Sequence, residues 1–594
     1  MLKNIKKYIT NNWLFLCILI IQLLALIFTF AFFKQGYHSD ELYEYGFANS
    51  YDLTVLEKDN NGNGLDRQWI DSNELNKYIT VDKDHRFSYI NIYKHATMDY
   101  YNPPLKLFIL HTICSFFPER FSKWFSFVIN IVSFIIIQFA LYHLLYKMFN
   151  NKFATIAGVV LFGFGAGCFD SMVFLRMYAL GMAFGVLFLY FSYCIFENTF
   201  KKKLTFYILT FVSLFLGAFT LHLFLVFAFP IVVVFCFGFL FSKRIKKMFA
   251  YGFTCLFSVI VSVIAFPKTI GDTAPSNETL TYALSSYSQP LQFRIYSHIA
   301  TIDNIGFHTS VYSNPWIKNS IAIFIFLVIV FIPLFLLIRK ENWFKNVIKR
   351  IINKLKSILK SMKYSHIVII ACICSIVFTV YICSIRTSVH LMSFKFSSRY
   401  LFLIYPLVSI VVVSVLYYFL AIIMPRIRIV AIYVLLISFL LALYSQFLTQ
   451  QNYLLRHNEE GITLKDIESN ANCIATLYLN WMVLCLAPEI NHTNSYYFVN
   501  YSDYKTDYSC FDEVDKNAPM YLIMDRSVVL SKEEMKIMEE DKDSVYNIFF
   551  NRSAILDEDI LNHYSSLSSV KNIELVGYDE VFCRPLEIYR ITFN

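Results

Sequence analysis

Charged residues are scarce in this chain, and their scarcity excludes a soluble globular protein. Lys, Arg, Asp and Glu make up 16% of the 594 residues, whereas a soluble domain usually carries about 25%. Hydrophobic residues make up 57%, and long apolar runs recur through the first three quarters of the sequence. A run of about 20 apolar residues is enough to cross a bilayer. The sequence therefore predicts a polytopic α-helical membrane protein.

Several binding motifs are also absent. Neither a Walker loop nor a GxGxxG motif occurs, so no nucleotide cofactor is expected. The C-terminal region has no CxxC pair that would suggest zinc. The net charge of +9 does not indicate a nucleic-acid partner, because Lys and Arg cluster in alternate loops between the apolar runs. No internal repeat is visible.

Eleven apolar segments are long enough to be membrane spans. The run 204–242 is divided at "TLHLF", because 39 apolar residues are about twice the length of one span and His222 lies in its middle. The expected spans are 12–33, 122–147, 153–170, 172–196, 204–221, 223–242, 249–267, 318–338, 365–385, 400–422 and 427–447.

The basic loops predict an orientation. Short cytoplasmic loops attract Lys and Arg, so we expect a cytoplasmic N-terminus and, after eleven spans, a C-terminal region outside. Low Gly with abundant Ile, Lys, Asn, Tyr and Phe is typical of an AT-rich bacterial genome, which favours a bacterial plasma membrane. The loops expected outside are 34–121, the turns 170–172 and 221–223, 268–317, 386–399 and 448–594.

Two domains are expected. Residues 1–447 would be the membrane domain, whose first outer loop, 34–121, contains a short helix at "DSNELNKYI" and an interfacial or re-entrant helix at "NPPLKLFILHTICSFF". Residues 448–594 would be a small α/β domain. Its expected strands are "IATLYL", "MYLIMD", "VYNIFF", "IELVGY" and "LEIYRITF", and its expected helices are "NWMVLCLAPEI" and "SKEEMKIMEEDK".

Ionisable residues gather at the expected outer ends of the spans. Such residues are costly at a membrane boundary unless they are paired or wet, so their convergence predicts a polar cavity at the outer leaflet. Taken singly they have ordinary explanations: Arg176 could snorkel or pair with Asp170, His222 could be a turn histidine, and the acids could be solvated. The residues are His38, Asp40 and Glu41 in "GYHSDELYEYG", Asp99, Arg176, His222, Arg386, His390, Lys395 and Arg399.

Five motifs, in order over about the first 410 residues, carry a resemblance. They are "YHSDELYEYGFANSYD", "NPPLKLFILHTICSFFPERFSKW", "RMYALGMAF", "TLHLFLVFAFP" and "SSRYLFLIYP". With them the chain resembles the multi-span GT-C glycosyltransferases, including protein O-mannosyltransferases, aminoarabinose transferases and bacterial glycosyltransferase-family-39-like proteins. The resemblance implies the GT-C fold and a polyprenyl-phosphate sugar as donor. It also implies that Asp40 is the base and that Arg399 contacts the phosphate.

The residue types suit that chemistry. A carboxylate can take the proton of an acceptor hydroxyl, and basic side chains can stabilise a leaving phosphate. Glu41 and Asp99 are the further acidic candidates for catalysis, and Glu41 could instead orient a substrate or a basic partner. The candidates for binding donor phosphate or substrate are His38, Asn102, Arg176, His222, Lys395 and Arg399.

One motif departs from the pattern of the relatives. They commonly show an acid, one residue and then His-Pro-Pro, whereas this chain has "DYYNPPL". Asn102 replaces the histidine and cannot take a proton at neutral pH, and Asp99 lies one residue farther away. A divalent cation could lie near Asp40, Glu41 and Asp99, but no ligand spacing requires one, so no cofactor is expected to be essential.

Other functions remain open from the sequence. A transporter or flippase also carries charges among its helices, but usually near the midplane and in repeated halves. A polymerase or ligase of the O-antigen type would place its chemistry in a later outer loop, and a scaffold without activity could keep the same fold. The sugar, and whether the acceptor is a glycan, a lipid or a protein, are not predicted.

Overall fold

The computed structural model describes most of the chain. The described residues are 2–51, 67–98, 103–197, 203–267, 364–387, 398–423, 429–434, 461–477, 483–500, 517–525, 529–530, 555–581 and 584–594, with the single positions 353, 426, 427 and 437.

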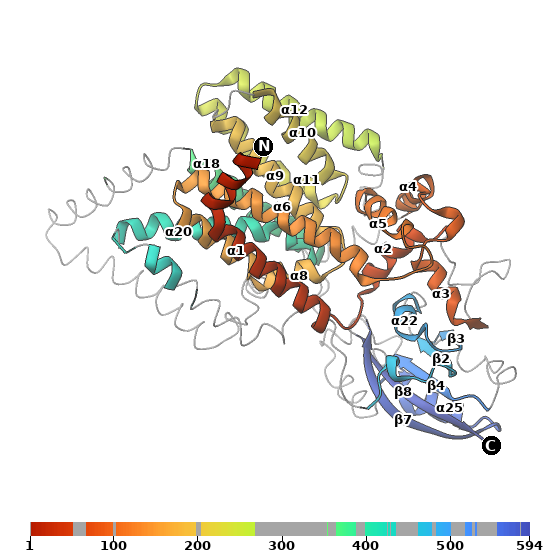
Figure 1. Ribbon diagram of the computed structural model, residues 1–594. Coiled ribbons are helices and arrows are strands. Elements are labelled where there is room, and N and C mark those ends of the chain that lie inside the picture. Colours follow the sequence, from red (N-terminus) through yellow and green to blue (C-terminus); the bar gives the residue numbers. More distant parts are fainter. Residues whose placement is uncertain are drawn as a thin grey trace, which may run out of the picture.

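Long apolar helices form a bundle, and short helices and a β-sheet lie at one end of it (Figure 1). The helix α9 lies inside the bundle and is the most buried of the candidate spans in the described ranges. The bundle helices are α1 (Leu2–Phe33), α6 (Lys123–Phe149), α7 (Lys152–Gly163), α8 (Ala166–Val173), α9 (Tyr178–Glu197), α10 (Lys203–Ala218), α11 (Leu223–Phe241), α12 (Ile245–Ala265), α18 (Ser365–Thr387) and α20 (Tyr405–Ile423).

Polar side chains link the helices within the bundle. The amide of Gln22 on α1 donates to the carbonyl of Val159 on α7 at 3.1 Å and accepts from Gln138 on α6 at 3.0 Å. A Cβ at Gly163 would lie 2.3 Å from both amide groups, so only glycine leaves room for this close approach.

The chain is a multi-pass membrane protein by its candidate spans. Among the described residues, seven helices are long and apolar enough to cross a membrane, or eight if the pair α7–α8 counts as one span. The expected span 153–170 is this pair, bent by 53°, and 204–221 forms the shorter apolar helix Leu204–Ala218. The span 318–338 and most of 427–447 lie outside the described residues. The other seven predicted spans are confirmed as long apolar helices: 12–33, 122–147, 172–196, 223–242, 249–267, 365–385 and 400–422.

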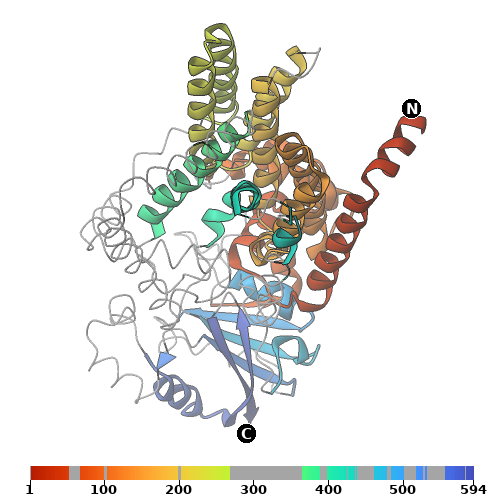
Figure 2. The same cartoon turned by 90° about the vertical axis from the view of Figure 1, so that its left-hand side faces the viewer.

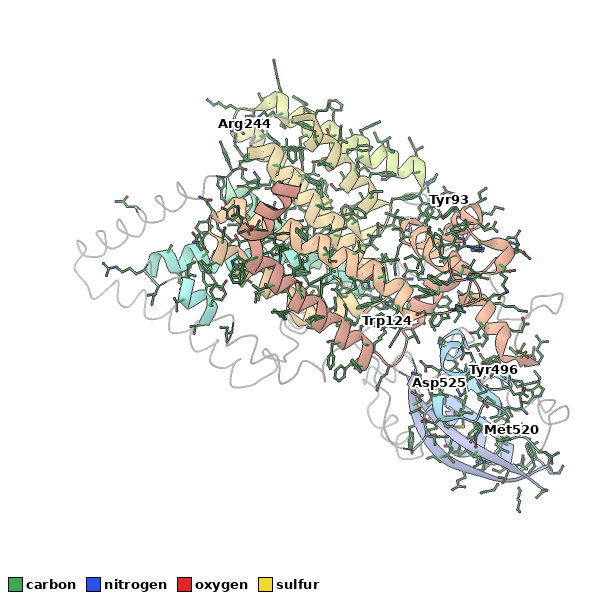
Figure 3. The ribbon with its side chains drawn as sticks, in the orientation of Figure 1. Tyr93, Trp124, Arg244, Tyr496, Met520 and Asp525 are labelled. Carbon is green, nitrogen blue, oxygen red and sulfur yellow. The ribbon has the colours of Figure 1, made fainter. Side chains whose placement is uncertain are left out.

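The loop after α1 folds into short helices that sit on the end of the bundle. Its elements are α2 (Ser39–Asn49), β1 (Trp69–Asp71), α3 (Ser72–Ile79), η1 (Lys83–His85), α4 (Tyr89–Met98) and α5 (Leu105–Ser115). The predicted helices at "DSNELNKYI" and "NPPLKLFIL" are therefore present as α3 and α5. The hydroxyl of Tyr93 donates to the carbonyl of Ala265 at 3.2 Å, which fastens α4 to the end of α12 (Figure 3).

The sheet combines two distant parts of the sequence. Its strand order is β1-β3-β2-β4-β8-β7, so β1, from the first loop, is an edge strand of the C-terminal sheet. β2, β3 and β4 are parallel, and β1, β7 and β8 are antiparallel to their neighbours. The C-terminal strands are β2 (Asn472–Leu477), β3 (Ser495–Asn500), β4 (Met520–Asp525), β7 (Val570–Val581) and β8 (Arg584–Phe593), and β5 (Val529–Leu530) and β6 (Ile555–Leu556) form a separate pair.

The first loop and the C-terminal region also share a hydrophobic core. Leu42 and Tyr45 of α2 and Leu75 of α3 are buried in one cluster with Leu486 and Ile490 of α22 (Val483–Ile490). The helices α3, η1, α4 and α5 of the first loop, the sheet, η4 (Leu464–Asp466), α22 and α25 (Asp557–Ser565) are together called the loop–sheet unit below. Figure 2 shows this sheet below the bundle, and Figure 3 shows Arg244 far from the sheet residue Met520.

Candidate active site

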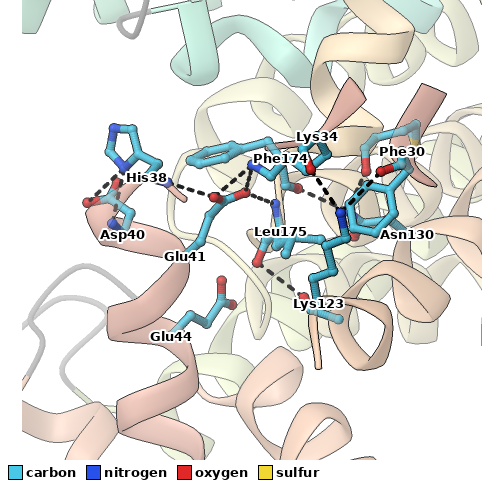
Figure 4. Close-up of polar contacts among 12 residues, drawn as sticks. Phe30, Lys34, His38, Asp40, Glu41, Glu44, Lys123, Asn130, Phe174 and Leu175 are labelled. Carbon is cyan, nitrogen blue, oxygen red and sulfur yellow. Dashed lines mark hydrogen bonds and ion pairs between the residues drawn. The ribbon is translucent and has the colours of Figure 1, made fainter. Parts of the chain in front are cut away.

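The site is built around the first turn of α2. His38 caps the helix: its Nδ1 accepts from the backbone N–H of Asp40 at 3.0 Å. The backbone N–H of His38 donates in return to Oε2 of Glu41 at 2.7 Å (Figure 4). This reciprocal capping box explains why the helix begins here, and the partial positive charge of a helix N-terminus favours both acids.

Glu41 is fully buried, and both oxygens of its carboxylate accept hydrogen bonds from other groups of the protein. Lys34 Nζ donates to both oxygens, at 2.8 and 2.9 Å, and the backbone N–H of Leu175 donates to Oε1 at 2.8 Å. Glu41 thus joins the end of α1, the start of α2 and the segment after α8.

That segment is a break between α8 and α9, and side chains satisfy its backbone. The sequence predicted the turn at 170–172, but α8 continues to Val173 and the break follows it. Asn130 donates to the carbonyls of Met172 and Phe174, at 2.8 and 2.9 Å, and Lys106 donates to that of Leu175 at 2.5 Å. Irregular backbone at membrane depth is stable only when such partners replace the helical hydrogen bonds.

Arg176 leaves this break and reaches α2. Its Nη1 donates to the carbonyl of Asp40 at 3.0 Å, and its Nε lies 3.7 Å from Glu44. Glu44 is also 3.3 Å from the buried Lys106, whose ammonium donates to Ser126 at 2.8 Å. Burial raises the pKa of Glu44 and lowers that of Lys106. The contacts of Glu44 and Lys106 therefore hold Arg176 in place, and Arg176 holds the backbone of Asp40.

Arg399 closes the site from a distant part of the chain. It begins the span Arg399–Ala421, within the 3-10 helix η3 (Ser398–Ile404) that leads into α20. Its Nη1 lies 3.1 Å from Oδ2 of Asp40 and 3.0 Å from Nε2 of His38. The side chains of Asp40 and Arg399 are 26% and 19% exposed, so this pair, unlike Lys34–Glu41, meets solvent.

The electrostatics keep Asp40 ionised and His38 neutral. Burial opposes ionisation of Asp40, but the guanidinium charges of Arg399 and Arg176 act against burial, and the pKa of Asp40 lies well below its usual range. Burial lowers the pKa of His38 more than the charge of Asp40 raises it. With His38 neutral, the cluster holds three cations, Arg399, Arg176 and Lys106, against the two carboxylates of Asp40 and Glu44, so it can accept a further anion.

The other predicted residues are not part of this cluster as described. His222 lies between α10 and α11, where its ring stacks on Phe266 with centroids 6.1 Å apart. Asp99, Asn102 and Lys395 lie outside the described residues, as does His390. His38, Asp40, Glu41, Arg176 and Arg399 are brought together.

The carboxylates of Asp40 and Glu41 face cations of the protein itself. Arg399 is 3.1 Å from Asp40, and Lys34 is 2.8 Å from Glu41. Within the described ranges, no group of three or more His, Cys, Asp and Glu side chains could hold a metal ion. A divalent cation between these two acids would have to displace Arg399 or Lys34, so these two acids do not suit one.

Sequence reasoning missed three residues of the cluster: Lys34, Glu44 and Lys106. Two signals could have found them. Glu44 follows Asp40 by four positions and so lies on the same face of the helix. Lys106 is a single charge inside the apolar stretch "PPLKLFIL", where a buried lysine needs an acidic partner.

Comparisons with known proteins give distant structural likenesses. No protein-family model matches the chain, and no curated protein matches its sequence. It is similar to the apo structure of ArnT from Cupriavidus metallidurans, with 8% identity, a TM-score of 0.39, and 92% of this chain and 96% of that chain covered. The same enzyme bound to undecaprenyl phosphate gives 8% identity, a TM-score of 0.37 and the same coverage. The Archaeoglobus fulgidus oligosaccharyltransferase complex with Zn and sulfate gives 10% identity, a TM-score of 0.44, and 94% and 79% covered.

Proposed function

We propose that the chain is an inverting glycosyltransferase that moves a sugar from a polyprenyl-phosphate donor to an acceptor hydroxyl. The Asp40–Arg399 pair carries the proposal: a carboxylate and a guanidinium, 3.1 Å apart and both partly exposed, lie at the end of apolar spans. A base and a phosphate ligand are thus adjacent where a lipid-borne donor would meet an acceptor from water.

In the proposed reaction Asp40 takes the proton of the acceptor hydroxyl, whose oxygen attacks the anomeric carbon of the sugar. The bond between that carbon and the phosphate oxygen breaks on the opposite face, so the anomeric configuration inverts. The polyprenyl phosphate leaves with one more negative charge, which Arg399 stabilises. The proton then passes from Asp40 to water, since part of its side chain is exposed.

Donor binding would also make Asp40 a better base. Arg399 holds the pKa of Asp40 low, and a carboxylate with a low pKa has little affinity for a proton. A donor phosphate on Arg399 shares that positive charge and weakens its hold on Asp40. The base would therefore gain proton affinity when the donor is in place.

The remaining residues take supporting parts in the proposal. Glu41, which is fully buried, positions the first turn of α2 through Lys34 rather than touching the substrate. Arg176 positions Asp40 through its carbonyl. His38, which is 1% exposed, would orient Arg399 toward the donor phosphate through their contact at 3.0 Å. We keep Asp99 as a second acid, and Asn102, His222 and Lys395 as further donor contacts.

In the proposed function the reaction takes place on the outer face of a bacterial plasma membrane, with the N-terminus of the protein in the cytoplasm. The acceptor is a glycan, a lipid or a protein. Purified protein in lipid should release or transfer the sugar of a labelled polyprenyl-phosphate hexose. The product should have the opposite anomeric configuration by NMR. A product of retained configuration would contradict the single displacement, and uptake of the donor without cleavage would favour a transporter.

A further inference from the structure

The connector, residues 34–37, runs from the end of α1 to His38, the capping residue of α2, and is held from two directions. Lys34 is held from the bundle, because Lys123 on α6 donates to its carbonyl at 2.8 Å. Gln35 is held from the loop–sheet unit, because Lys465 donates to its carbonyl at 3.2 Å. Tyr37 packs edge-on against Phe121 at 5.5 Å. Asp40 follows this connector by only three residues, so the position of its carboxylate depends on how the connector is held.

Glu489 on α22 fixes Lys465 in its place. Its side chain is 1% exposed, although a glutamate is almost never buried without a partner. Lys465 Nζ lies 3.0 Å from Oε2 of Glu489. Burial raises the pKa of Glu489, and Lys465, Lys123 and His492 act against burial. A buried carboxylate strongly favours a nearby cation, so Lys465 is kept where it also reaches Gln35.

We propose that Glu489 and Lys465 are positioning residues for catalysis, through which the loop–sheet unit sets the start of α2 and hence Asp40. The inference rests on the glycosyl transfer proposed above. The C-terminal region would thus take part in the reaction, although it is far from Asp40 in the sequence.

Other contacts join the first loop to the C-terminal region besides this ion pair. β1 pairs with β3 over three residues, and the N–H of Ser72 donates to the carbonyl of Asn494 at 3.3 Å. The amide of Asn491 donates to that of Asn76 at 3.3 Å. These contacts hold the loop to the C-terminal region independently, so removing the pair should leave the unit folded while loosening the connector.

The test uses the full-length protein in lipid with four variants. Lys465→Met removes a half-exposed cation, and Lys465→Arg restores the charge. Lys83→Met is the matched control, because Lys83 forms an exposed ion pair with Glu119 at 2.6 Å in the same unit. Glu489→Gln tests the other partner. Two quantities are measured: kcat and KM for the labelled donor, and hydrogen exchange of the backbone amides in residues 34–45.

We expect Lys465→Met and Glu489→Gln to lower kcat about tenfold with KM for the donor within about twofold, because a small misplacement of a base costs rate rather than binding. Amide exchange in 34–45 should become faster in both, while α18 is unchanged. Lys465→Arg should restore both quantities, and Lys83→Met should change neither. Unchanged exchange in 34–45 would overturn the inference even if no donor is cleaved. An inactive wild type would instead count against the glycosyl transfer.

Discussion

Nη1 of Arg399 lies 3.1 Å from Oδ2 of Asp40, although the two residues are far apart in the sequence. Asp40 follows the first candidate span, and Arg399 begins the last one in the described ranges. The pair is exposed enough to meet a substrate, whereas the neighbouring pair of Lys34 and Glu41 is buried. One ion pair is thus available for chemistry, and the other holds the helix that carries it.

Replacing Arg399 should weaken donor binding and slow transfer. Arg399→Gln removes a charge-assisted contact with phosphate, worth about 1.5–3 kcal/mol, so kcat/KM for the donor should fall roughly 10- to 100-fold. Arg399→Lys keeps the charge but not the forked geometry and should lie between wild type and Arg399→Gln. Steady-state kinetics with the labelled donor check this. An Arg399→Gln enzyme with wild-type kcat/KM would contradict the assignment of Arg399 as the ligand of the donor phosphate.

The pH dependence should report the charge on Asp40. Its pKa in the folded protein lies below the usual value of about 3.9. The ionised form is therefore present, with its contribution to stability, above that value, and it is lost only as the pH falls through the lowered pKa. Wild-type kcat/KM should show no acidic limb from Asp40 between about pH 5 and 8.

In Arg399→Gln, burial is no longer outweighed by the nearest cation, so the pKa of Asp40 should rise. An acidic limb should then move upward into the measured range of kcat/KM. The residual activity of Arg399→Gln, followed from about pH 4 to 8, gives the result. A limb at the same pH in both enzymes would mean that another group titrates.

Replacing Glu41 should lower the stability of the fold, because its carboxylate balances the buried charge of Lys34. Glu41→Gln leaves Lys34 as a buried charge without its counter-ion, which costs about 3–5 kcal/mol. The double variant Lys34→Met/Glu41→Gln buries no charge and should recover part of that loss. Thermal unfolding in detergent measures both. A single variant as stable as the wild type would show that the pair does not anchor α2.

Chelation should leave the activity unchanged. Asp40 and Glu41 are engaged by Arg399 and Lys34, so in the proposed reaction positive charge at the donor phosphate would come from the protein itself. Transfer measured in EDTA, with and without added Mg²⁺ or Mn²⁺, is expected to be equal within about twofold. Activity that disappears in EDTA and returns with one cation would require a metal site that includes residues beyond these two acids.

The sequence predicted the parts of the site that are local. His38, Asp40 and Glu41 follow directly on an apolar span and were predicted as candidates from that position. The helix α2 and its capping box were not predicted, although short-range rules are enough to place them. The break before Arg176 was predicted four residues too early, because "MVFL", residues 172–175, is apolar and contains no turn-forming residue. Its position depends on Asn130 and Lys106, which come from other helices.

Long-range pairing was beyond prediction for the same reason. β1 is three residues long, and its partner strand β3 lies more than 400 positions away, so no local pattern marks either as a neighbour. β2, β4, β7 and β8 were predicted from their alternating or buried apolar runs. β3, "SYYFVN", was missed because it follows directly on the turn-forming residues "NHTN". The predicted elements "VYNIFF" and "SKEEMKIMEEDK" lie outside the described ranges.

The most direct test of the account compares Asp40→Asn with Asp84→Asn, an exposed acid in the same loop, for sugar transfer from a labelled polyprenyl-phosphate hexose. Asparagine keeps the shape of the side chain but takes no proton at neutral pH. Transfer should fall about 10²- to 10⁴-fold in Asp40→Asn and stay at the wild-type rate in Asp84→Asn. Equal transfer by Asp40→Asn and the wild type would contradict the assignment of Asp40 as the base.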